Sequence, residues 1–217
     1  DIVSASGIDN TIAWYENNGA ANPTFTAADI ATNADGAESI DLADLDGDGD
    51  LDIVSVSMDD DTVAWYENNG AIDPTWTATD IATNVDEAED VRVGDIDSDG
   101  DLDIITASQN DDTIALFLND GAINPSWTKL VVSTNADKAT GVDFADLDGD
   151  GDLDIVSSSF SDDTIAWYEN VGSTRISISD VTTANENAAN ATFTVSLNQT
   201  SDEDVTVAYA TSNGTAT

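Results

Sequence analysis

Cysteine and histidine are both missing from the 217 residues, and their absence excludes several kinds of chemistry. Without cysteine the chain can form no disulfide and has no thiol nucleophile. Without either residue it also lacks an imidazole general base and the usual ligands of zinc. Basic residues are almost as scarce, with 4 Lys and Arg against 45 Asp and Glu and a formal net charge of −41. Because so few basic side chains cannot neutralise the phosphates of nucleic acids or lipids, we expect no nucleic-acid partner and no attraction to anionic membranes.

Long apolar runs are also missing, so we expect no direct insertion into a membrane. Hydrophobic residues nevertheless make up 40% of the chain, which is ordinary for a folded protein. The chain is long enough for one or two domains with cores of their own. The acidity outside the motifs described next favours a soluble surface or one adapted to salty surroundings.

Three aspartate-rich loops dominate what the sequence does contain. They span residues 44–52, 95–103 and 146–154, and their first aspartates lie 51 residues apart each time. Each loop carries a carboxylate at every second position, and such closely spaced negative charges repel one another unless a cation lies among them. The equal spacing indicates that each candidate cation site belongs to one repeated structural unit.

Each loop offers an oxygen-only set of ligands. Positions 1, 3, 5 and 9 would contribute carboxylates and position 7 its backbone carbonyl, while glycine at position 6 permits a sharp turn. Many charged oxygens on a flexible backbone favour Ca²⁺ over Mg²⁺, so we expect about three equivalent Ca²⁺ sites. The candidate ligands are Asp44, Asp46, Asp48, Asp50, Asp52, Asp95, Asp97, Asp99, Asp101, Asp103, Asp146, Asp148, Asp150, Asp152 and Asp154.

Two other interpretations of the loops are weaker. An EF-hand needs glutamate at position 12 and flanking helices, but Ser55, Thr106 and Ser157 occupy that position and β-branched segments follow. A solvated acidic turn that binds nothing has no need of five carboxylates in each of three loops in the same register.

A second motif has the same period. Residues 11–17 (Thr-Ile-Ala-Trp-Tyr-Glu-Asn) recur with small changes at 62–68, 113–119 and 164–170. In one repeat, alternating and apolar segments predict strands at 89–94, 102–107, 113–119 and 127–133. Four strands in about 50 residues are typical of a propeller blade, so we expect an all-β partial propeller of about 3.4 four-stranded blades. Asp1 has the repeat position of Asp52, so we expect it to end a fourth loop of a longer chain.

Other recurring residues have structural interpretations. The Trp-Tyr pairs at 14–15, 65–66 and 167–168 resemble a sugar-stacking platform, but their fixed place in the repeat favours a core between blades. The turns at 59–61, 110–112 and 161–163 predict hairpins whose Asp residues adopt left-handed geometry rather than secondary cation contacts. Arg92 is expected to pair with neighbouring carboxylates rather than mark a ligand site.

The pattern Asp-x-Asp-x-Asp-Gly-x-x-Asp, followed by an apolar strand and then Asp-Asp-Thr-Ile-Ala-Trp-Tyr-Glu-Asn, resembles the FG-GAP/VCBS repeats. Such repeats occur in the propellers of integrin α-subunits and in many large secreted or surface proteins of bacteria. The resemblance covers residues 1–172 and implies calcium-binding propeller blades.

Residues 174–217 lose the repeat and contain alternating segments at 175–181, 191–197 and 205–211. They resemble the N-terminal part of a Calx-β domain, which implies a truncated immunoglobulin-like β-sandwich. Glu186 matches an early acidic position of that family, whereas Asn213 stands where its members usually carry Asp.

These features together predict a non-enzymatic, calcium-stabilised scaffold of an extracellular or cell-surface protein, which presents loops for adhesion or recognition of a protein or carbohydrate ligand. A carbohydrate-binding or polysaccharide-degrading module is the alternative, because similar repeats accompany such enzymes and carboxylate pairs can hydrolyse glycosides. The conspicuous carboxylates recur in every repeat, however, whereas catalytic residues are usually singular. A spacer without any ligand is a third interpretation, which calcium titration would separate from the first.

Overall fold

A computed structural model describes residues 1–172, 176–178 and 195–197, which belong to two compact units, Asp1–Asn170 and Val171–Thr217. All regular structure in these residues is strand, which confirms the all-β prediction. Within these ranges the chain has no helix that is long and apolar enough to cross a membrane.

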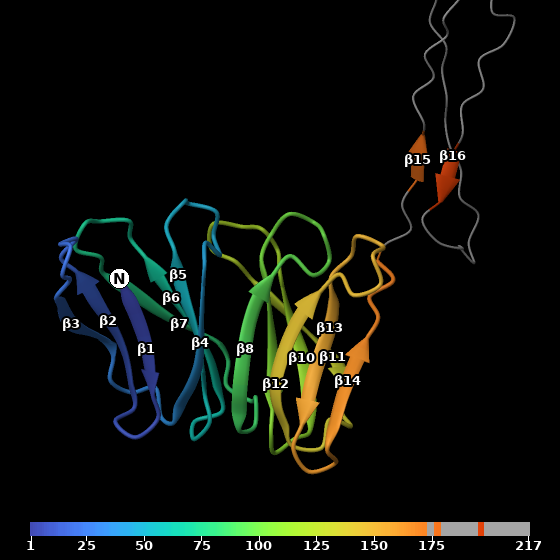
Figure 1. Ribbon diagram of the computed structural model, residues 1–217, viewed down its shortest axis with the longest axis horizontal. Coiled ribbons are helices and arrows are strands. Elements are labelled where there is room, and N and C mark those ends of the chain that lie inside the picture. Colours follow the sequence, from blue (N-terminus) through green and yellow to red (C-terminus); the bar gives the residue numbers. More distant parts are fainter. Residues whose placement is uncertain (173–175, 179–194, 198–217) are drawn as a thin grey trace, which may run out of the picture. The chain divides into compact units, whose positions relative to one another are not determined.

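The first unit consists of successive antiparallel sheets in which each strand pairs with the next along the chain (Figure 1). Two complete sheets of four strands lie between two sheets of three. The strands of the first two sheets are β1 (Ile2–Ser6), β2 (Thr11–Asn17) and β3 (Phe25–Ala31), then β4 (Ala37–Ala43), β5 (Asp52–Ser57), β6 (Thr62–Asn68) and β7 (Trp76–Ala82). Those of the last two are β8 (Ala88–Gly94), β9 (Asp103–Ser108), β10 (Thr113–Asn119) and β11 (Trp127–Ser133), then β12 (Ala139–Ala145), β13 (Asp154–Ser159) and β14 (Thr164–Tyr168).

In the second unit, β15 (Ile176–Ile178) and β16 (Val195–Leu197) form an antiparallel pair. They fall within two of the three segments predicted to be strands, at 175–181 and 191–197. The third predicted segment, 205–211, lies outside the described residues, as do Glu186 and Asn213.

The strand pattern follows from the apolar runs in each repeat. The second strands β5 and β9 are buried along their whole length, because they lie inside a sheet with a strand on either side and further sheets against their faces. The outermost strands β7 and β11 are largely exposed and contain alternating polar residues. In each case burial decreases from the middle of a sheet toward its outer edge.

Aspartate residues close the hairpins between second and third strands. Asp61, Asp112 and Asp163 have φ values of 57°, 55° and 53°, and Asn10 takes the same place in the first sheet with 59°. Asn and Asp tolerate this left-handed conformation better than other residues with a side chain. The prediction that these segments are turns is therefore confirmed.

The sheets are joined through their first strands. β4 packs against β8, and β8 packs against β12, so these strands form a row (Figure 1). Carboxylates reinforce both contacts, because Asp41 accepts a hydrogen bond from the Val93 amide (2.9 Å) and Asp90 accepts one from the Val142 amide (3.1 Å). Asp90 also pairs with Arg92 at 2.6 Å, as expected for that arginine.

The hydrophobic core lies between neighbouring sheets. Trp65 and Tyr66 of β6 are both 4% exposed, and they belong to clusters on opposite sides of the second sheet. In the third sheet Phe117 takes the place of the tyrosine and is 2% exposed. Trp167 of β14 is 52% exposed, because none of the described residues forms a following sheet against it. The core interpretation of the Trp-Tyr motif thus holds where a sheet has neighbours on both sides.

Candidate metal centres

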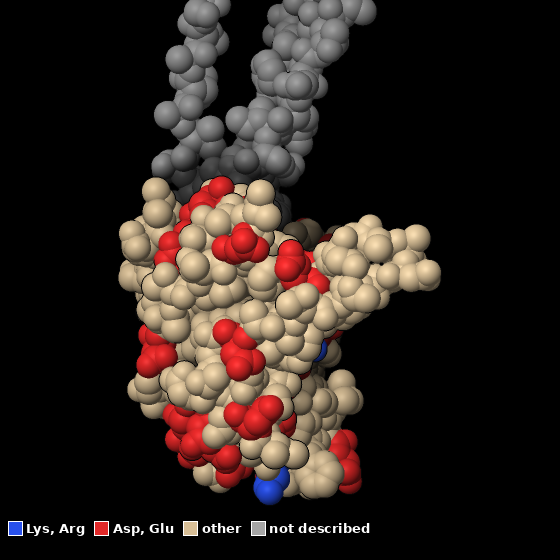
Figure 2. Space-filling view, turned by 90° about the vertical axis from the view of Figure 1, so that its left-hand side faces the viewer, with Lys and Arg blue, Asp and Glu red and all other residues tan. Residues whose placement is uncertain are grey.

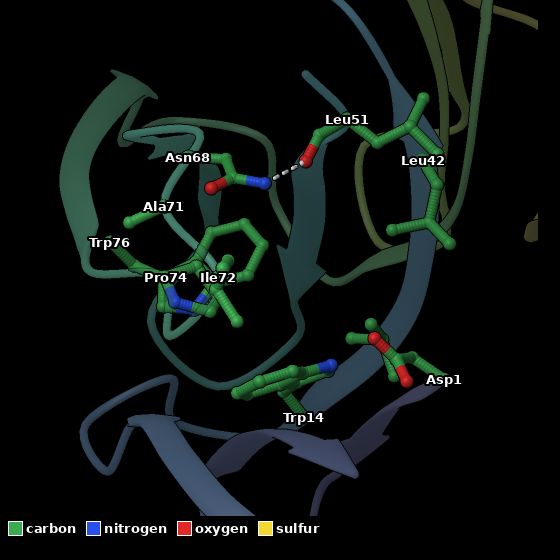
Figure 3. A pocket seen from close by; sticks show the side chains of 10 residues that line it. Asp1, Trp14, Leu42, Leu51, Asn68, Ala71, Ile72, Pro74 and Trp76 are labelled. Carbon is green, nitrogen blue, oxygen red and sulfur yellow. Dashed lines mark hydrogen bonds between the residues drawn. The ribbon is translucent and has the colours of Figure 1, made fainter. Parts of the chain in front are cut away.

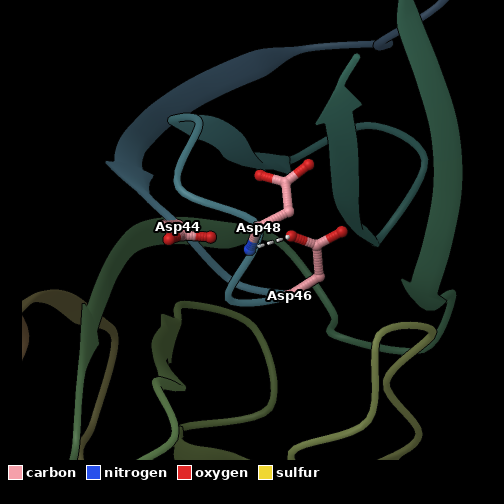
Figure 4. Close-up of side chains that lie close together, drawn as sticks. All are labelled: Asp44, Asp46 and Asp48. Carbon is pink, nitrogen blue, oxygen red and sulfur yellow. Dashed lines mark hydrogen bonds between the residues drawn. The ribbon is translucent and has the colours of Figure 1, made fainter. Parts of the chain in front are cut away.

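Each aspartate loop gathers its first three carboxylates. Asp44, Asp46 and Asp48 each offer one oxygen, and the three oxygens lie within 4.8 Å of one another (Figure 4). The loops before β9 and β13 repeat this arrangement with Asp95, Asp97, Asp99 and with Asp146, Asp148, Asp150. Three carboxylate oxygens at such distances can hold a hard divalent cation.

The backbone of the loop makes this gathering possible. Gly49, Gly100 and Gly151 have φ values near 100°, a conformation that residues with a side chain rarely adopt. The sharp turn points amide groups inward, so that the Gly49 amide donates to Asp44 Oδ2 (2.9 Å) and the Asp48 amide donates to Asp46 Oδ1 (3.2 Å). The loop is therefore preformed by its own hydrogen bonds.

The last aspartate of each loop ties the loop to its sheet. Asp52 is 1% exposed, and its two carboxylate oxygens accept hydrogen bonds from the amides of Leu45 (3.2 Å) and Asn68 (2.8 Å). Asp103 and Asp154 have the same pair of partners one and two repeats later. These carboxylates lie outside the three gathered clusters, although each oxygen keeps a second lone pair for a cation.

The carboxylates at position 7 also lie outside the clusters. The carboxylate of Asp50 lies against Gly70, so closely that a side chain at Gly70 would collide with it. Asp101 and Gly121 repeat this contact, and Asp152 is 2% exposed. The side chains of Asp50 and Asp101 thus pack on the turn after the third strand, and the prediction that the backbone carbonyl of position 7 is a ligand stays a prediction.

An asparagine from the next sheet covers each of the first two loops. Asn119, at the end of β10, donates to the carbonyl of Leu45 (2.9 Å) and to that of Leu102 in its own repeat (3.1 Å). Asn170 donates in the same way to Ile96 (2.8 Å) and Leu153 (3.1 Å). The sequence analysis missed this role, although the Asn that closes the motif of 113–119 and 164–170 was visible as part of the repeat.

Exposure of the clusters increases from the first loop to the third. The first cluster is mostly half-buried, the second is mostly exposed, and the third is exposed throughout. In the third loop both oxygens of Asp146 accept amide hydrogen bonds, from Gly149 (2.7 Å) and Gly151 (3.2 Å). The three loops therefore share one sequence pattern but differ in their surroundings.

Two buried oxygens show that the loops fit a cation. Asp44 Oδ1 and Asp95 Oδ1 are shielded from solvent and have no hydrogen-bond partner among the described residues. A buried carboxylate oxygen without a partner costs free energy, and a divalent ion beside it would remove that cost. Both residues belong to the gathered clusters, so the donor sets and these unsatisfied atoms lie in the same loops.

Burial and repulsion between carboxylates raise the pKa of several loop aspartates. Burial raises the pKa of Asp97, and the negative charges of Asp99 and Asp95 raise it further. Burial also raises the pKa of Asp103, to about 6, despite the amide hydrogen bonds that it accepts. The pKa of Asp154 is instead lowered, chiefly by the hydrogen bond from the Asn170 amide.

Acidic residues also lie outside the loops. On the face of the molecule shown in Figure 2, Asp and Glu side chains form several separate patches from one end to the other, and very few basic side chains are visible. This distribution agrees with the interpretation of the remaining acidity as a property of the general surface.

Comparison with known proteins identifies the repeat. A family model described as FG-GAP-like repeat matches three overlapping stretches, residues 1–55, 44–106 and 95–157. Two of these matches begin at Asp44 and Asp95, the first residues of the first two aspartate loops. No curated protein matches the chain.

Proposed function

The chain belongs to the family of FG-GAP-like repeats, and we propose that it is a non-enzymatic scaffold stabilised by Ca²⁺ in each of its three aspartate loops. The observation that carries this proposal is the pair of buried, unpartnered oxygens, Asp44 Oδ1 and Asp95 Oδ1, inside clusters of gathered carboxylates. A Ca²⁺ ion accepts six to eight oxygen ligands in flexible geometry, which suits a loop of carboxylates and carbonyls better than the strict octahedron of Mg²⁺.

The proposed role of the ion is structural. Each loop connects the first and second strands of a sheet, and the first strands join neighbouring sheets. An ion in the loop would cancel the repulsion between carboxylates and hold this connection rigid. Binding to the folded chain alone would add about 2.7 kcal/mol per site at a free concentration of 100 Kd, so that folding would depend on calcium.

For the architecture we propose blades of a β-propeller. The support is the succession of antiparallel sheets, the row formed by their first strands and the apolar clusters between adjacent sheets. For residues 174–217 we propose the N-terminal part of a Calx-β-like, immunoglobulin-like sandwich, supported by the sequence resemblance and by the antiparallel pairing of β15 and β16.

The setting that we propose is the cell surface or the extracellular space, where calcium is abundant enough for sites with Kd values of about 10⁻⁴–10⁻³ M. The loops and turns at the ends of the sheets would then present a surface to a protein or carbohydrate ligand. Recurrence of the same carboxylates in each repeat supports a structural rather than a catalytic role for them.

Thermal unfolding of the Asp97→Asn variant tests the proposal. Calcium should raise the melting temperature of the wild-type chain, and it should raise that of the variant less, because one ligand of the second site is lost. Asp73→Asn serves as the matched control, since Asp73 is exposed and lies outside the clusters. An equal response to calcium in all three proteins, or no response in any, would contradict the proposal.

A further inference from the structure

Two cavities beside the second sheet differ in the chemistry of their walls. The larger one, of about 370 Å³, has mainly apolar walls, which include Trp14, Ile72 and Trp76 (Figure 3). The smaller one, of about 100 Å³, is lined mainly by polar side chains. These polar lining residues are Asn33, Ser57, Asp60, Thr62, Tyr66 and Asp80. Walls rich in oxygen atoms suit a hydrogen-bond donor or a cation.

The polar cavity lies on the face of the second sheet that packs toward the first. Ser57 and Tyr66 come from β5 and β6, Asp80 comes from β7, and Asn33 lies in the segment between β3 and β4. Ser57 is 2% exposed and Tyr66 is 4% exposed, whereas Asp60 and Asp80 are exposed. The cavity therefore has a buried floor and opens to solvent beside its two carboxylates.

The two carboxylates give the cavity a negative potential. Burial raises the pKa of Tyr66, and the charges of Asp60 and Asp80 raise it further, so both carboxylates lie close enough to act on its hydroxyl group. Asp60 accepts a hydrogen bond from the Asp35 amide (3.4 Å), but none of the residues that line the cavity is basic. A cation in the cavity would be attracted by both carboxylates.

One repeat later, a cation of the chain itself occupies the equivalent place. Lys129 of β11 is one of the four basic residues. Its ammonium group lies over the Phe117 ring, 5.7 Å from the ring centre, and donates to the Asn84 carbonyl at 3.5 Å. The third sheet thus shows that a ring and a carbonyl at these positions hold an ammonium group.

The cavity keeps these walls but lacks the lysine. The repeat positions of Asn84, Phe117, Lys129 and Val131 are held there by Asn33, Tyr66, Ala78 and Asp80, respectively. Ala78 lies opposite Tyr66 in the strand pairing, as Lys129 lies opposite Phe117. Absence of the built-in cation is accompanied by the additional carboxylate of Asp80, so the cavity is open and more negative than its counterpart.

We propose that the cavity binds a primary ammonium group, carried by a free amine or by a lysine side chain of a partner. The ammonium group would lie over the Tyr66 ring and donate to the Asn33 carbonyl, with Asp80 as its counter-ion. A volume of about 100 Å³ suits a small alkylammonium group. The inference does not depend on the ion in the aspartate loops, because the first loop precedes β5 and Asp60 follows it, at opposite ends of that strand.

An NMR titration of the isotope-labelled chain with methylammonium chloride tests the proposal. Calcium is kept in excess and sodium chloride keeps the ionic strength constant, so that binding in the loops and general screening of the −41 charge do not change. The backbone amide signals of Asn33, Thr62 and Asp80 should shift and saturate together. Sodium chloride alone should produce no saturable shift at these amides.

Four variants separate the cavity from the acidic surface. Asp80→Asn should weaken the binding about two- to fivefold, as expected for loss of an ion pair near the surface. Asp73→Asn removes the same charge from an exposed position outside the cavity and should leave the affinity unchanged. Ala78→Lys should place a tethered ammonium group in the cavity, as Lys129 does in the third sheet, and abolish the saturable shifts. Thr77→Lys adds the same charge on the opposite face of β7, so binding should persist.

A second probe, Nα-acetyl-lysine amide, separates the two sources of the ammonium group. Binding of this probe assigns the site to a lysine side chain, whereas binding of methylammonium alone assigns it to a free amine. Absence of saturable shifts with both probes, or equal saturation by sodium, would overturn the proposal. An unchanged affinity in Asp80→Asn or retained binding in Ala78→Lys would overturn it as well.

Discussion

At the scale of residues, the aspartates of one loop divide into two groups with different tasks. Those at positions 1, 3 and 5, such as Asp44, gather their oxygens, whereas Asp52 at position 9 binds the amides of Leu45 and Asn68. The spacing of aspartates in the sequence predicted the gathering, because a loop with glycine at position 6 turns back on itself. It did not predict the second task, since the Asn68 amide lies 16 residues further along the chain and reaches Asp52 only through strand pairing.

The raised pKa of Asp103 predicts how the stability of the metal-free chain depends on pH. Its folded-state pKa is about 6, above the ordinary value of 3.8, so between these values the folded chain binds more protons than the unfolded chain. The free energy of unfolding should therefore fall as the pH rises from about 4.5 to about 6.5. Urea denaturation of the metal-free chain across this range measures the slope.

Two substitutions to asparagine test whether Asp103 causes this pH dependence. In Asp103→Asn the free energy of unfolding should fall less between pH values of about 4.5 and about 6.5, because the residue no longer titrates. Asp154→Asn should leave this decrease in place, since the pKa of Asp154 is lowered and the group is already ionised in this range. An unchanged slope in Asp103→Asn would show that burial of this carboxylate does not govern the pH dependence.

At the scale of elements, the sequence predicted the strands well and their surroundings poorly. The strands expected at 89–94, 102–107, 113–119 and 127–133 correspond to β8–β11 with shifts of at most one residue, because alternation and turn residues are local signals. Whether another sheet packs over a strand or loop depends on residues much further along the sequence. Asn119 reaches the Leu45 carbonyl across 74 residues, and Trp167 has the sequence of a buried tryptophan but is exposed.

Removal of the asparagine cover should destabilise the chain and weaken the first metal site. Asn119→Ala leaves the buried carbonyls of Leu45 and Leu102 without their side-chain donor, which costs about 1–3 kcal/mol. The affinity of the first loop for Ca²⁺ should fall more than that of the second, although Asn119 belongs to the repeat of the second loop. Asn68→Ala is the matched control, because the side chain of Asn68 bonds only groups of its own repeat among the described residues, the Leu51 carbonyl and the Gly70 amide. Equal losses in both variants would argue against the cover.

The contact between β8 and β12 should not tolerate a larger residue at Gly94. A methyl group there would lie 2.3 Å from the ring of Phe144, far inside van der Waals contact. Gly94→Ala should therefore lower the free energy of unfolding by about 1–3 kcal/mol. The loss should be smaller in a Phe144→Leu background, and a double-mutant cycle by urea denaturation measures the difference. Additive effects of the two substitutions would mean that the sheets are not in contact there.

At the scale of the whole molecule, the three loops are equivalent in sequence but not in environment. The first two have an asparagine cover and a buried oxygen that no described residue satisfies, at Asp44 and Asp95. The third has no asparagine cover among the described residues, and both oxygens of its first aspartate, Asp146, are engaged by amides. The sequence predicted three equivalent sites because it records the ligands of a loop but not the sheet that packs over them. We therefore expect two tighter sites and one weaker site.

Isothermal titration calorimetry of the metal-free chain with CaCl₂ tests the central claim most directly. The account predicts binding to all three loops, with two sites tighter than the third and with Mg²⁺ binding more weakly throughout. Titration at constant ionic strength separates this binding from general screening of the −41 charge. Absence of binding, or a preference for Mg²⁺, would contradict the account.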